Sequence, residues 1–322
     1  MFQIISTLGP ASLNTEFLEL CDKYHQLYFR LNGSHLNETT LYEYIKFVKR
    51  TLPGKSIQFY LDLQGSKIRI GELAQPLMLR EHQMITLASR DSGSEAVLHL
   101  PGEVFAQLRS SLEVLLQDGT IRLRIVQWSP HEATAEVIQG GTLRSRAGIY
   151  FRGLSFFQRN IPYNQKVQIQ IAAKSGITHL ALSFIQSAEE MNTLREFCEK
   201  IEYSPKFIAK IERPEALQRL SSIISVADEV WYCRGDLGEF LPWKELGPWQ
   251  EKTIQIARQQ QKPVFIAGQV FQHMTNYPQP TRSEVVHFHY IRKQGVSGIV
   301  LSDETAIGQF PQHALQVTYN LI

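Results

Sequence analysis

The stretch KFIAKIERPEALQRLSSIISVADEVWYCRGDLG, residues 206–238, contains the alternation from which the fold follows. An apolar run at residues 206–211 is typical of a buried strand, and residues 215–227 carry apolar side chains at helical spacing. A second apolar run follows at residues 229–233. A strand, a helix and another strand in this order predict two parallel strands joined by a crossover helix.

The same alternation continues along the rest of the chain. Six further strand-like runs are expected at residues 3–7, 27–31, 58–63, 180–184, 264–268 and 298–301. Amphipathic segments of helical length are expected at residues 15–24, 37–51, 188–201, 248–261 and 282–294. Eight strands that alternate with helices predict an α/β protein and favour a TIM (β/α)8 barrel. An open, doubly wound sheet is the alternative, because the number of strands does not prove that the sheet closes.

One interval interrupts the alternation after the third strand. Between residues 71 and 152 the sequence has short β-type runs at residues 84–88, 96–100, 121–126 and 133–138. Turn residues separate these runs, at Asp91-Ser92-Gly93, Asp118-Gly119 and Gly140-Gly141. A structureless loop of this length would be unusual in a compact domain. We therefore expect a barrel domain formed by residues 1–70 and 153–322, and a small inserted β-barrel-like domain at residues 71–152.

The composition argues against several classes of function. The 33 basic residues nearly balance the 31 acidic ones, so no nucleic acid partner is expected. No apolar stretch is long enough to span a bilayer and no export signal is recognisable, so no membrane partner is expected either. The three cysteines, Cys21, Cys198 and Cys233, are far apart, which argues against a disulfide framework and favours a reducing cytoplasm.

Charged residues follow the fifth and sixth expected strands. In a (β/α)8 barrel the functional groups gather at the C-terminal ends of the strands. The fifth strand ends in Lys210-Ile211-Glu212, and the sixth continues into Arg234-Gly235-Asp236-Leu237-Gly238. Either motif alone could be an ordinary strand end. Two carboxylates at adjacent strand ends are, however, typical of a Mg²⁺ site.

Further polar residues follow the second and third strands. They are Arg30-Leu31-Asn32-Gly33-Ser34-His35 and Asp62-Leu63-Gln64-Gly65-Ser66-Lys67-Ile68-Arg69. Taken singly, Asn32-Gly33 could be a plain turn, and His35, Lys67 and Arg69 could be solvated surface side chains. Their occurrence in order, at the ends of consecutive strands, favours one functional site.

These motifs together resemble the pyruvate kinase family, from residue 4 to about residue 314. The matching segments include Thr7-Leu8-Gly9-Pro10-Ala11-Ser12, Pro280-Thr281-Arg282-Ser283-Glu284-Val285 and Leu301-Ser302-Asp303-Glu304-Thr305-Ala306, besides the motifs at residues 30–35, 210–212 and 234–238. The inserted domain is similar to the small β domain that acts as a lid over the barrel in that family.

The resemblance implies a cytoplasmic, glycolytic enzyme that moves a phosphoryl group between phosphoenolpyruvate, or a related enol acid, and ADP or ATP. It implies that Glu212 and Asp236 hold Mg²⁺ or Mn²⁺. The implied catalytic residues are Lys210, Arg30, Ser302 and Glu304. The implied substrate-binding residues are Lys210, Gly235, Asp236, Gly268 and Ser183. The implied nucleotide-binding residues are Arg30, Asn32, His35 and Arg69.

The third-strand motif carries a further implication about monovalent cations. Family members that require potassium typically have Thr, Lys and Glu where this chain has Leu63, Gln64 and Lys67, whereas members that do not require it resemble this chain, including an aliphatic residue like Ile70. We predict that potassium is not required, because the Lys67 ammonium can replace the cation.

Two departures from the family pattern leave other functions open. Gly268 stands where the family usually has a threonine, which removes a hydroxyl and suggests room for a larger enol acid. Ala147 stands where the family has a nucleotide-contacting lysine, although Arg146 is adjacent. The alternatives are a metal-dependent enolate lyase or decarboxylase on a pyruvate-type acid, and a catalytically silent homologue that binds the ligand. The family's C-terminal allosteric domain has no counterpart in residues 1–322, so a monomer or dimer is expected rather than a tetramer.

Overall fold

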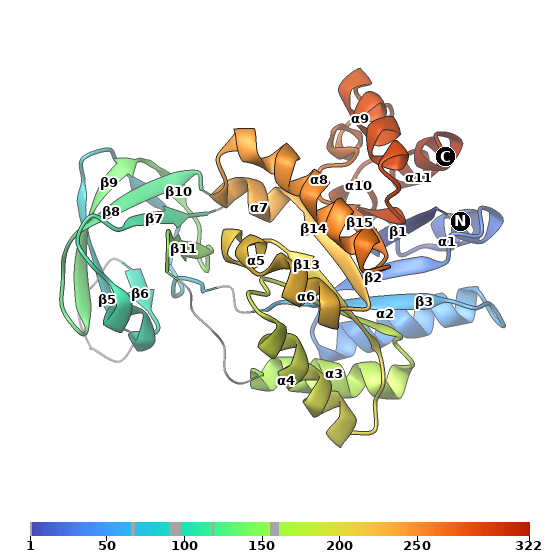
Figure 1. Ribbon diagram of the computed structural model, residues 1–322, viewed down its shortest axis with the longest axis horizontal. Helices are drawn as coiled ribbons and strands as arrows, with labels where there is room; N and C mark the ends of the chain where they lie inside the picture. Colours follow the sequence, from blue (N-terminus) through green and yellow to red (C-terminus); the bar gives the residue numbers. More distant parts are fainter. Residues whose placement is uncertain (1, 66–67, 90–97, 118, 155–160) are drawn as a thin grey trace. The chain divides into compact units, whose positions relative to one another are not determined.

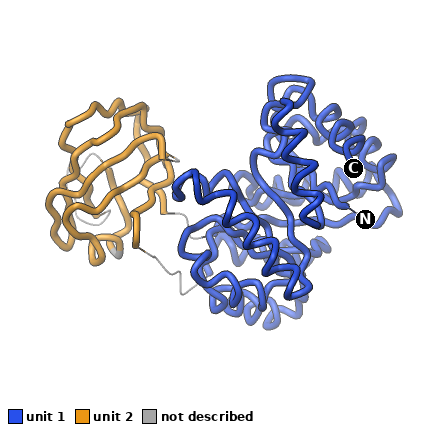
Figure 2. Tube along the Cα trace, turned by 45° about the horizontal axis from the view of Figure 1, so that its top comes forward, with its two compact units in different colours: residues 1–65, 158–322 blue, residues 66–157 orange. Residues whose placement is uncertain are grey.

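The chain forms two compact units (Figure 2). The structure is a computed structural model, and it describes residues 2–65, 68–89, 98–117, 119–154 and 161–322. Unit 1 comprises Met1–Gly65 and Gln158–Ile322, and unit 2 comprises Ser66–Phe157. Each unit has a hydrophobic core of its own.

Unit 1 is a closed barrel of eight parallel strands. In chain order these strands are β1 (Gln3–Leu8), β2 (Tyr28–Asn32), β3 (Gln58–Leu63), β12 (His179–Leu182), β13 (Lys206–Ile211), β14 (Glu229–Cys233), β15 (Val264–Ala267) and β16 (Gly298–Leu301). The barrel closes because β1 pairs with both β2 and β16. The predicted (β/α)8 barrel is thus confirmed, and the open sheet is excluded.

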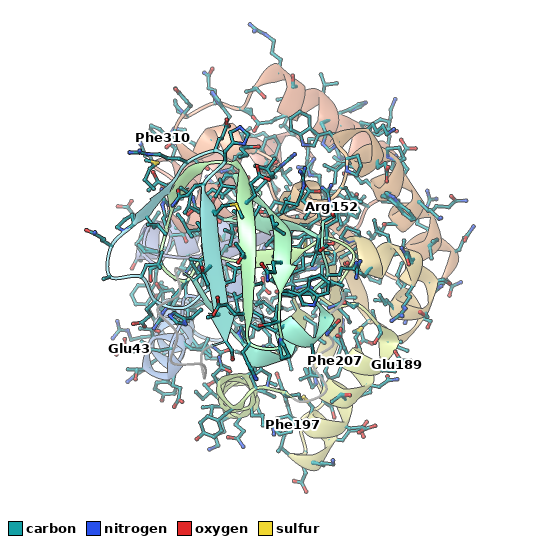
Figure 3. The ribbon with its side chains drawn as sticks, turned by 90° about the vertical axis from the view of Figure 1, so that its left-hand side faces the viewer. Glu43, Arg152, Glu189, Phe197, Phe207 and Phe310 are labelled. Atoms are coloured by element: carbon teal, nitrogen blue, oxygen red, sulfur yellow. The ribbon has the colours of Figure 1, made fainter. Side chains whose placement is uncertain are left out.

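Helices surround the strands of the barrel (Figure 1). They are α1 (Thr15–Lys23), α2 (Glu38–Thr51), α3 (Tyr163–Ser175), α4 (Ala188–Lys200), α5 (Pro214–Gln218), α6 (Leu220–Val226), α7 (Arg234–Phe240), α8 (Trp243–Gln259), α9 (Arg282–Lys293), α10 (Asp303–Ala306) and α11 (Pro311–Asn320), with a short 3-10 helix η2 (Gln272–Thr275). Apolar side chains at helical spacing, such as Leu41, Ile45 and Val48 of α2, pack into the core between helices and strands. Charged side chains on the opposite faces, such as Glu43 and Glu189, are exposed to solvent (Figure 3).

Two helices differ from the sequence-based expectation. The single helix expected at residues 215–227 is divided into α5 and α6, because Arg219 has a non-helical φ of −118°. The helix expected to begin at Pro248 begins five residues earlier, at Trp243, so that Pro248 lies inside α8. Proline usually marks the first turn of a helix, and here that signal was misleading.

The interior of the barrel is filled with side chains. Ile5, Tyr60, Ile208, Trp231 and Phe265 form one buried cluster inside the strands. The barrel is therefore a packed core that leaves room for a ligand only at its ends.

Unit 2 is an all-β insertion between β3 and α3, as the sequence predicted. Its described strands are β4 (Leu77–Leu79), β5 (Met84–Ser89), β6 (Leu98–Leu100), β7 (Glu113–Leu116), β8 (Ile121–Trp128), β9 (Glu132–Gln139), β10 (Gly141–Leu143) and β11 (Ile149–Phe151), with a 3-10 helix η1 (Gly102–Gln107). Six strands form one curled sheet in the order β11-β7-β8-β9-β5-β6, and β10 pairs with β4. The described strands thus make a curled sheet rather than a closed barrel.

The expected turns of unit 2 are partly outside the described residues. Asp91-Ser92-Gly93 and Asp118 lie there, whereas Gly119 joins β7 to β8 with a φ of 77°. In the part of the chain that the structure describes, every helix is too short or too polar to cross a membrane.

Candidate active site

A small cavity of about 70 Å³ lies at the C-terminal ends of the barrel strands. Its lining consists of Arg30, Lys210, Glu212, Trp231, Cys233, Gly235, Asp236, Ala267, Gly268, Val300 and Ser302. Seven of these residues were predicted from the sequence, and they come from several strands and the segments that follow them: Arg30, Lys210, Glu212, Gly235, Asp236, Gly268 and Ser302. Pockets for drug-sized ligands usually measure roughly 300–1,000 Å³. The cavity therefore suits a small molecule.

Asp62, on β3, holds the charged groups of this site together. Its carboxylate accepts hydrogen bonds from Arg30 Nε at 2.7 Å and from Lys210 Nζ at 2.9 Å. Ser183 Oγ donates to the same carboxylate at 2.8 Å. Burial alone would raise the pKa of Asp62, but the nearby charges of Lys210 and Arg30 hold it below its usual value. Asp62 is therefore an anion between two cations.

The sequence carries a signal for Asp62, although its motif does not by itself give this residue a role. It is the single charged residue in the strand QFYLDL, and it is 2% exposed. A lone acid inside an otherwise apolar strand must find partners in the barrel interior, because an unpaired buried charge is very costly. Only the folded barrel shows which partners these are.

Lys210, on β13, has its ammonium group fixed by three acceptors. Besides Asp62, Nζ donates to Ser183 Oγ at 2.8 Å and lies 2.7 Å from Glu212 Oε1. Burial disfavours the charged form, but Asp62 and Glu212 raise the pKa of Lys210 above its usual value. The site thus presents a permanent positive charge in a fixed position, which can neutralise charge that develops on a reacting group.

Glu212 lies at the end of the same strand and is 1% exposed. Its Oε2 accepts a hydrogen bond from the backbone N–H of Phe184 at 2.7 Å, and Phe184 has a positive φ of 59° that few residues of its type adopt. Burial and the negative charge of Asp236 raise the pKa of Glu212 to about 7, against the opposing effect of Lys210. Burial and Asp236 therefore disfavour the carboxylate form of Glu212, even with Lys210 beside it.

Asp236 and Gly235 belong to the first turn of α7, which begins directly after β14. A Cβ added to Gly235 would meet nothing within 4 Å, so its backbone is open to a ligand. Among the described residues no group of three or more His, Cys, Asp and Glu side chains could hold a metal ion. Two carboxylates, Glu212 and Asp236, nevertheless suit Mg²⁺, which is usually bound by one or two carboxylates while substrate and water oxygens complete its coordination. A cation at this position would stabilise the carboxylate form of Glu212.

Gly268 has a structural role that the sequence did not show. Its φ is 77°, and a Cβ at this position would lie 3.0 Å from the backbone nitrogen of Gly235. Arg234 fixes this conformation, because its Nε and Nη2 donate to the Gly268 carbonyl at 3.0 and 2.9 Å. The expectation that Gly268 leaves room for a larger acid therefore finds no support, since the glycine packs against Gly235 in a conformation that disfavours side chains.

Ser302 and Glu304 occupy different places. Ser302 lines the cavity, whereas Glu304 is fully buried behind it. Glu304 accepts hydrogen bonds from the backbone N–H groups of Ser302 at 2.7 Å and Phe271 at 3.0 Å. Glu304 thus positions the loops that follow β15 and β16, and we assign it no contact with a substrate.

The predicted nucleotide-binding residues are divided between the two units. Arg30 lines the cavity, Asn32 lies at the end of β2, and His35 is exposed nearby in the chain. Arg69 belongs to unit 2, where its Nη1 donates to the carbonyl of Arg146 at 3.1 Å. Lys67, predicted to replace a potassium ion, lies outside the described residues.

Fold and site together define the class of protein. The chain is a (β/α)8-barrel protein with an inserted β unit, and its charged site combines a lysine, an arginine and three carboxylates at the C-terminal ends of the strands. The family model described as "Pyruvate kinase, barrel domain" matches residues 1–315. The chain therefore belongs to the pyruvate kinase family, as its motifs indicated.

Curated relatives agree with this assignment. A pyruvate kinase of Agrobacterium vitis is 30% identical over 327 residues, which cover 99% of this chain and 68% of the relative. A pyruvate kinase of Methylorubrum extorquens is 31% identical over 319 residues, which cover 97% and 66%. Pyruvate kinase 2 of Synechocystis is 30% identical over 324 residues, which cover 98% and 55%. The chain thus spans between about half and two thirds of the length of these relatives.

Proposed function

We propose that the protein transfers a phosphoryl group between phosphoenolpyruvate, or a closely related enol acid, and ADP or ATP, with Mg²⁺ and without a requirement for potassium. The observation that carries this proposal is the fixed contact of Lys210 with Asp62 and Glu212 beside a cavity of small-molecule size. Phosphoryl transfer depends mainly on positioning and on neutralisation of negative charge. A preorganised lysine and arginine beside metal-binding carboxylates supply both.

Each residue has a role in this proposal. Glu212 and Asp236 would hold Mg²⁺, which when bound would supply charge neutralisation for the enol oxygen and the phosphoryl group. Lys210 would stabilise the same charges with its ammonium group. Arg30, which Asp62 holds by its Nε, would contact the transferred phosphoryl group. The open backbone at Gly235 would accept the carboxylate of the acid.

The inserted β unit completes the proposal. We assign residues 1–70 and 153–322 to the catalytic barrel and residues 71–152 to a lid that excludes water during transfer. Asn32, His35 and Arg69 would bind the nucleotide phosphates. We place this activity in the cytoplasm, where the three free and buried cysteines, Cys21, Cys198 and Cys233, would remain reduced.

A coupled assay tests the proposal. The purified protein is incubated with phosphoenolpyruvate, ADP and Mg²⁺, and both pyruvate and ATP are measured. We expect both products in equal amounts. The substitution Lys210→Met should lower the rate by at least about 10²- to 10³-fold, because it removes a preorganised charge from the reacting group.

The matched control is Lys206→Met, at the exposed start of the same strand, which should leave the rate unchanged. Binding of the acid in calorimetry without ATP formation would contradict phosphoryl transfer and would favour a lyase or a silent ligand-binding protein instead. Equal rates for Lys210→Met and the unmodified protein would contradict the assigned site.

A further inference from the structure

Trp231 is a large side chain in the cavity lining to which the residue roles above give no function. It lies on β14 between Glu229 and Cys233, and its side chain faces the barrel interior. It is fully buried, yet it contributes to the wall of the 70 Å³ cavity. The indole therefore closes the cavity on the side of the barrel interior.

The surroundings of Trp231 hold the indole in place. The ring of Tyr60 packs against it with a centroid distance of 5.7 Å and an interplanar angle of 35°. Tyr60 is itself stacked on His179, with centroids 4.1 Å apart. Both aromatic residues are fully buried, and such a packed interior resists displacement of a ring. A ligand in the cavity thus meets a rigid surface rather than an adaptable one.

The cavity lining combines two kinds of side chain. Its charged side chains are those of Arg30, Lys210, Glu212 and Asp236. Trp231, Cys233, Ala267 and Val300 also line it and belong to the buried cluster inside the strands. An acid whose oxygens face the charged groups would place its carbon end against these less polar residues. The number of carbon atoms that fit is then limited by the nearest side chain that cannot move aside.

We propose that Trp231 is the residue that determines specificity, restricting the site to three-carbon acids of the pyruvate type. This inference rests on the proposed function, because it takes the acid to bind with its oxygens toward Lys210 and Glu212. Gly268 does not provide space for a longer acid, since its backbone packs on Gly235 and is held by Arg234. Shortening of residue 231 would extend the cavity toward Tyr60, whose ring packs against the indole.

The test compares acids that differ only in chain length. Pyruvate, 2-oxobutanoate and 2-oxopentanoate are titrated calorimetrically in the presence of Mg²⁺ into the unmodified protein and into Trp231→Leu. An extra methylene that a hydrophobic pocket cannot accommodate usually changes affinity by about 10- to 200-fold. We expect the unmodified protein to prefer pyruvate over 2-oxopentanoate by at least tenfold, and Trp231→Leu to reduce that preference by at least tenfold.

Two further variants make the result decisive. Tyr232→Leu is the matched control, because Tyr232 is the next residue on the strand, is equally buried and belongs to the core outside the barrel strands. Tyr232→Leu should prefer pyruvate over 2-oxopentanoate by the same factor as the unmodified protein. Trp231→Phe keeps an aromatic ring and should also reduce the preference for pyruvate over 2-oxopentanoate, by a smaller factor than Trp231→Leu. It replaces Trp231→Leu in the test if that variant does not fold.

The outcomes separate this inference from the function on which it rests. If the unmodified protein binds pyruvate but the preference is the same in every variant, the role of Trp231 is overturned while the proposed function stands. Equal affinity of the unmodified protein for all three acids also overturns it. If no acid binds to the unmodified protein, the proposed function itself fails.

Discussion

At the scale of single residues, Asp62 links groups that are distant in the sequence. It accepts hydrogen bonds from Arg30 on β2, from Lys210 on β13 and from Ser183 just beyond β12. Because Arg30 and Lys210 both donate to this one carboxylate, its negative charge matters more for stability than its shape. An asparagine in place of Asp62 would have a similar shape but no charge. Of the carboxylates in these contacts, Glu212 beside Lys210 would then be left to balance the buried positive charges of Arg30 and Lys210.

The substitution Asp62→Asn should therefore be strongly destabilising. Removing one partner of a buried ion pair costs about 3–5 kcal/mol, and we expect a loss of this size in the free energy of unfolding measured with urea. Asp22→Asn is the control, since Asp22 pairs with Lys55 at 2.8 Å in a partly exposed position. That change should cost less than about 1 kcal/mol. Similar losses for the two variants would refute the central role of Asp62.

A histidine beside the site predicts a pH dependence of stability. His287 lies 3.1 Å from Arg234, and burial together with the charge of Arg234 lowers the pKa of His287 to about 4. The unfolded chain, in which this pKa is about 6.5, therefore binds the proton more readily. The stability that the neutral His287 contributes to the folded protein is complete above pH 6.5 and is lost as the pH falls from 6.5 toward 4.

We expect His287→Gln to lose less stability than the unmodified protein between pH 7.5 and pH 5. The difference should be about 1 kcal/mol after allowance for partial exposure of the imidazole, and urea unfolding at the two pH values measures it. His289→Gln, two residues further along α9 and exposed, should behave like the unmodified protein. Identical pH dependence in all three proteins would show that His287 titrates normally.

At the scale of elements, α9 shows how a local motif helps to shape the surroundings of the site. Thr281 and Glu284 form a capping box, in which Thr281 Oγ1 accepts from the Glu284 backbone N–H at 3.2 Å and Glu284 Oε2 accepts from the Thr281 N–H at 2.7 Å. Glu284 Oε1 also accepts from the backbone N–H of His273 in η2, at 2.9 Å. The start of α9 is thereby tied to the segment that follows β15.

Loss of this cap should be measurable without loss of the fold. Thr281→Ala should lower the free energy of unfolding by about 1 kcal/mol, within a usual range of about 0.5–2 kcal/mol for N-cap residues. Ser283→Ala, in the exposed first turn of the same helix, removes a hydroxyl that makes no capping contact and should change stability little. A larger loss for Ser283→Ala than for Thr281→Ala would contradict the assigned cap.

At the scale of the whole molecule, the role of Lys67 can be tested by the cation requirement. We expect turnover with phosphoenolpyruvate, ADP and Mg²⁺ to be the same when potassium is replaced by tetramethylammonium at constant ionic strength. Lys67→Met should lower the rate by at least about tenfold, because it removes the ammonium group that we propose as the replacement for the cation. Lys55→Met, which removes a partly exposed ammonium group, is the control. A large activation of the unmodified protein by potassium would contradict the prediction.

Much of this molecule could be predicted without coordinates. Strands that are buried on both faces appear in the sequence as continuous apolar runs, as in β13 and β14, and their alternation with amphipathic helices predicted the barrel. Ordered motifs at the strand ends indicated the family, because each motif is local and therefore visible in a few consecutive letters. The division of α5 from α6 at Arg219 was not predictable, since no proline or glycine marks it.

The organisation of the site, in contrast, was decided by the tertiary structure. Asp62 and Lys210 are 148 positions apart in the chain, and only closure of the barrel brings their charged groups within 2.9 Å. The same closure places Trp231 against the cavity and fixes Gly268 against Gly235. Sequence patterns report which segments are buried strands, because burial on both faces gives a local, continuous apolar run. They do not report which side chains of those strands meet, because that depends on strand order and register around the whole barrel.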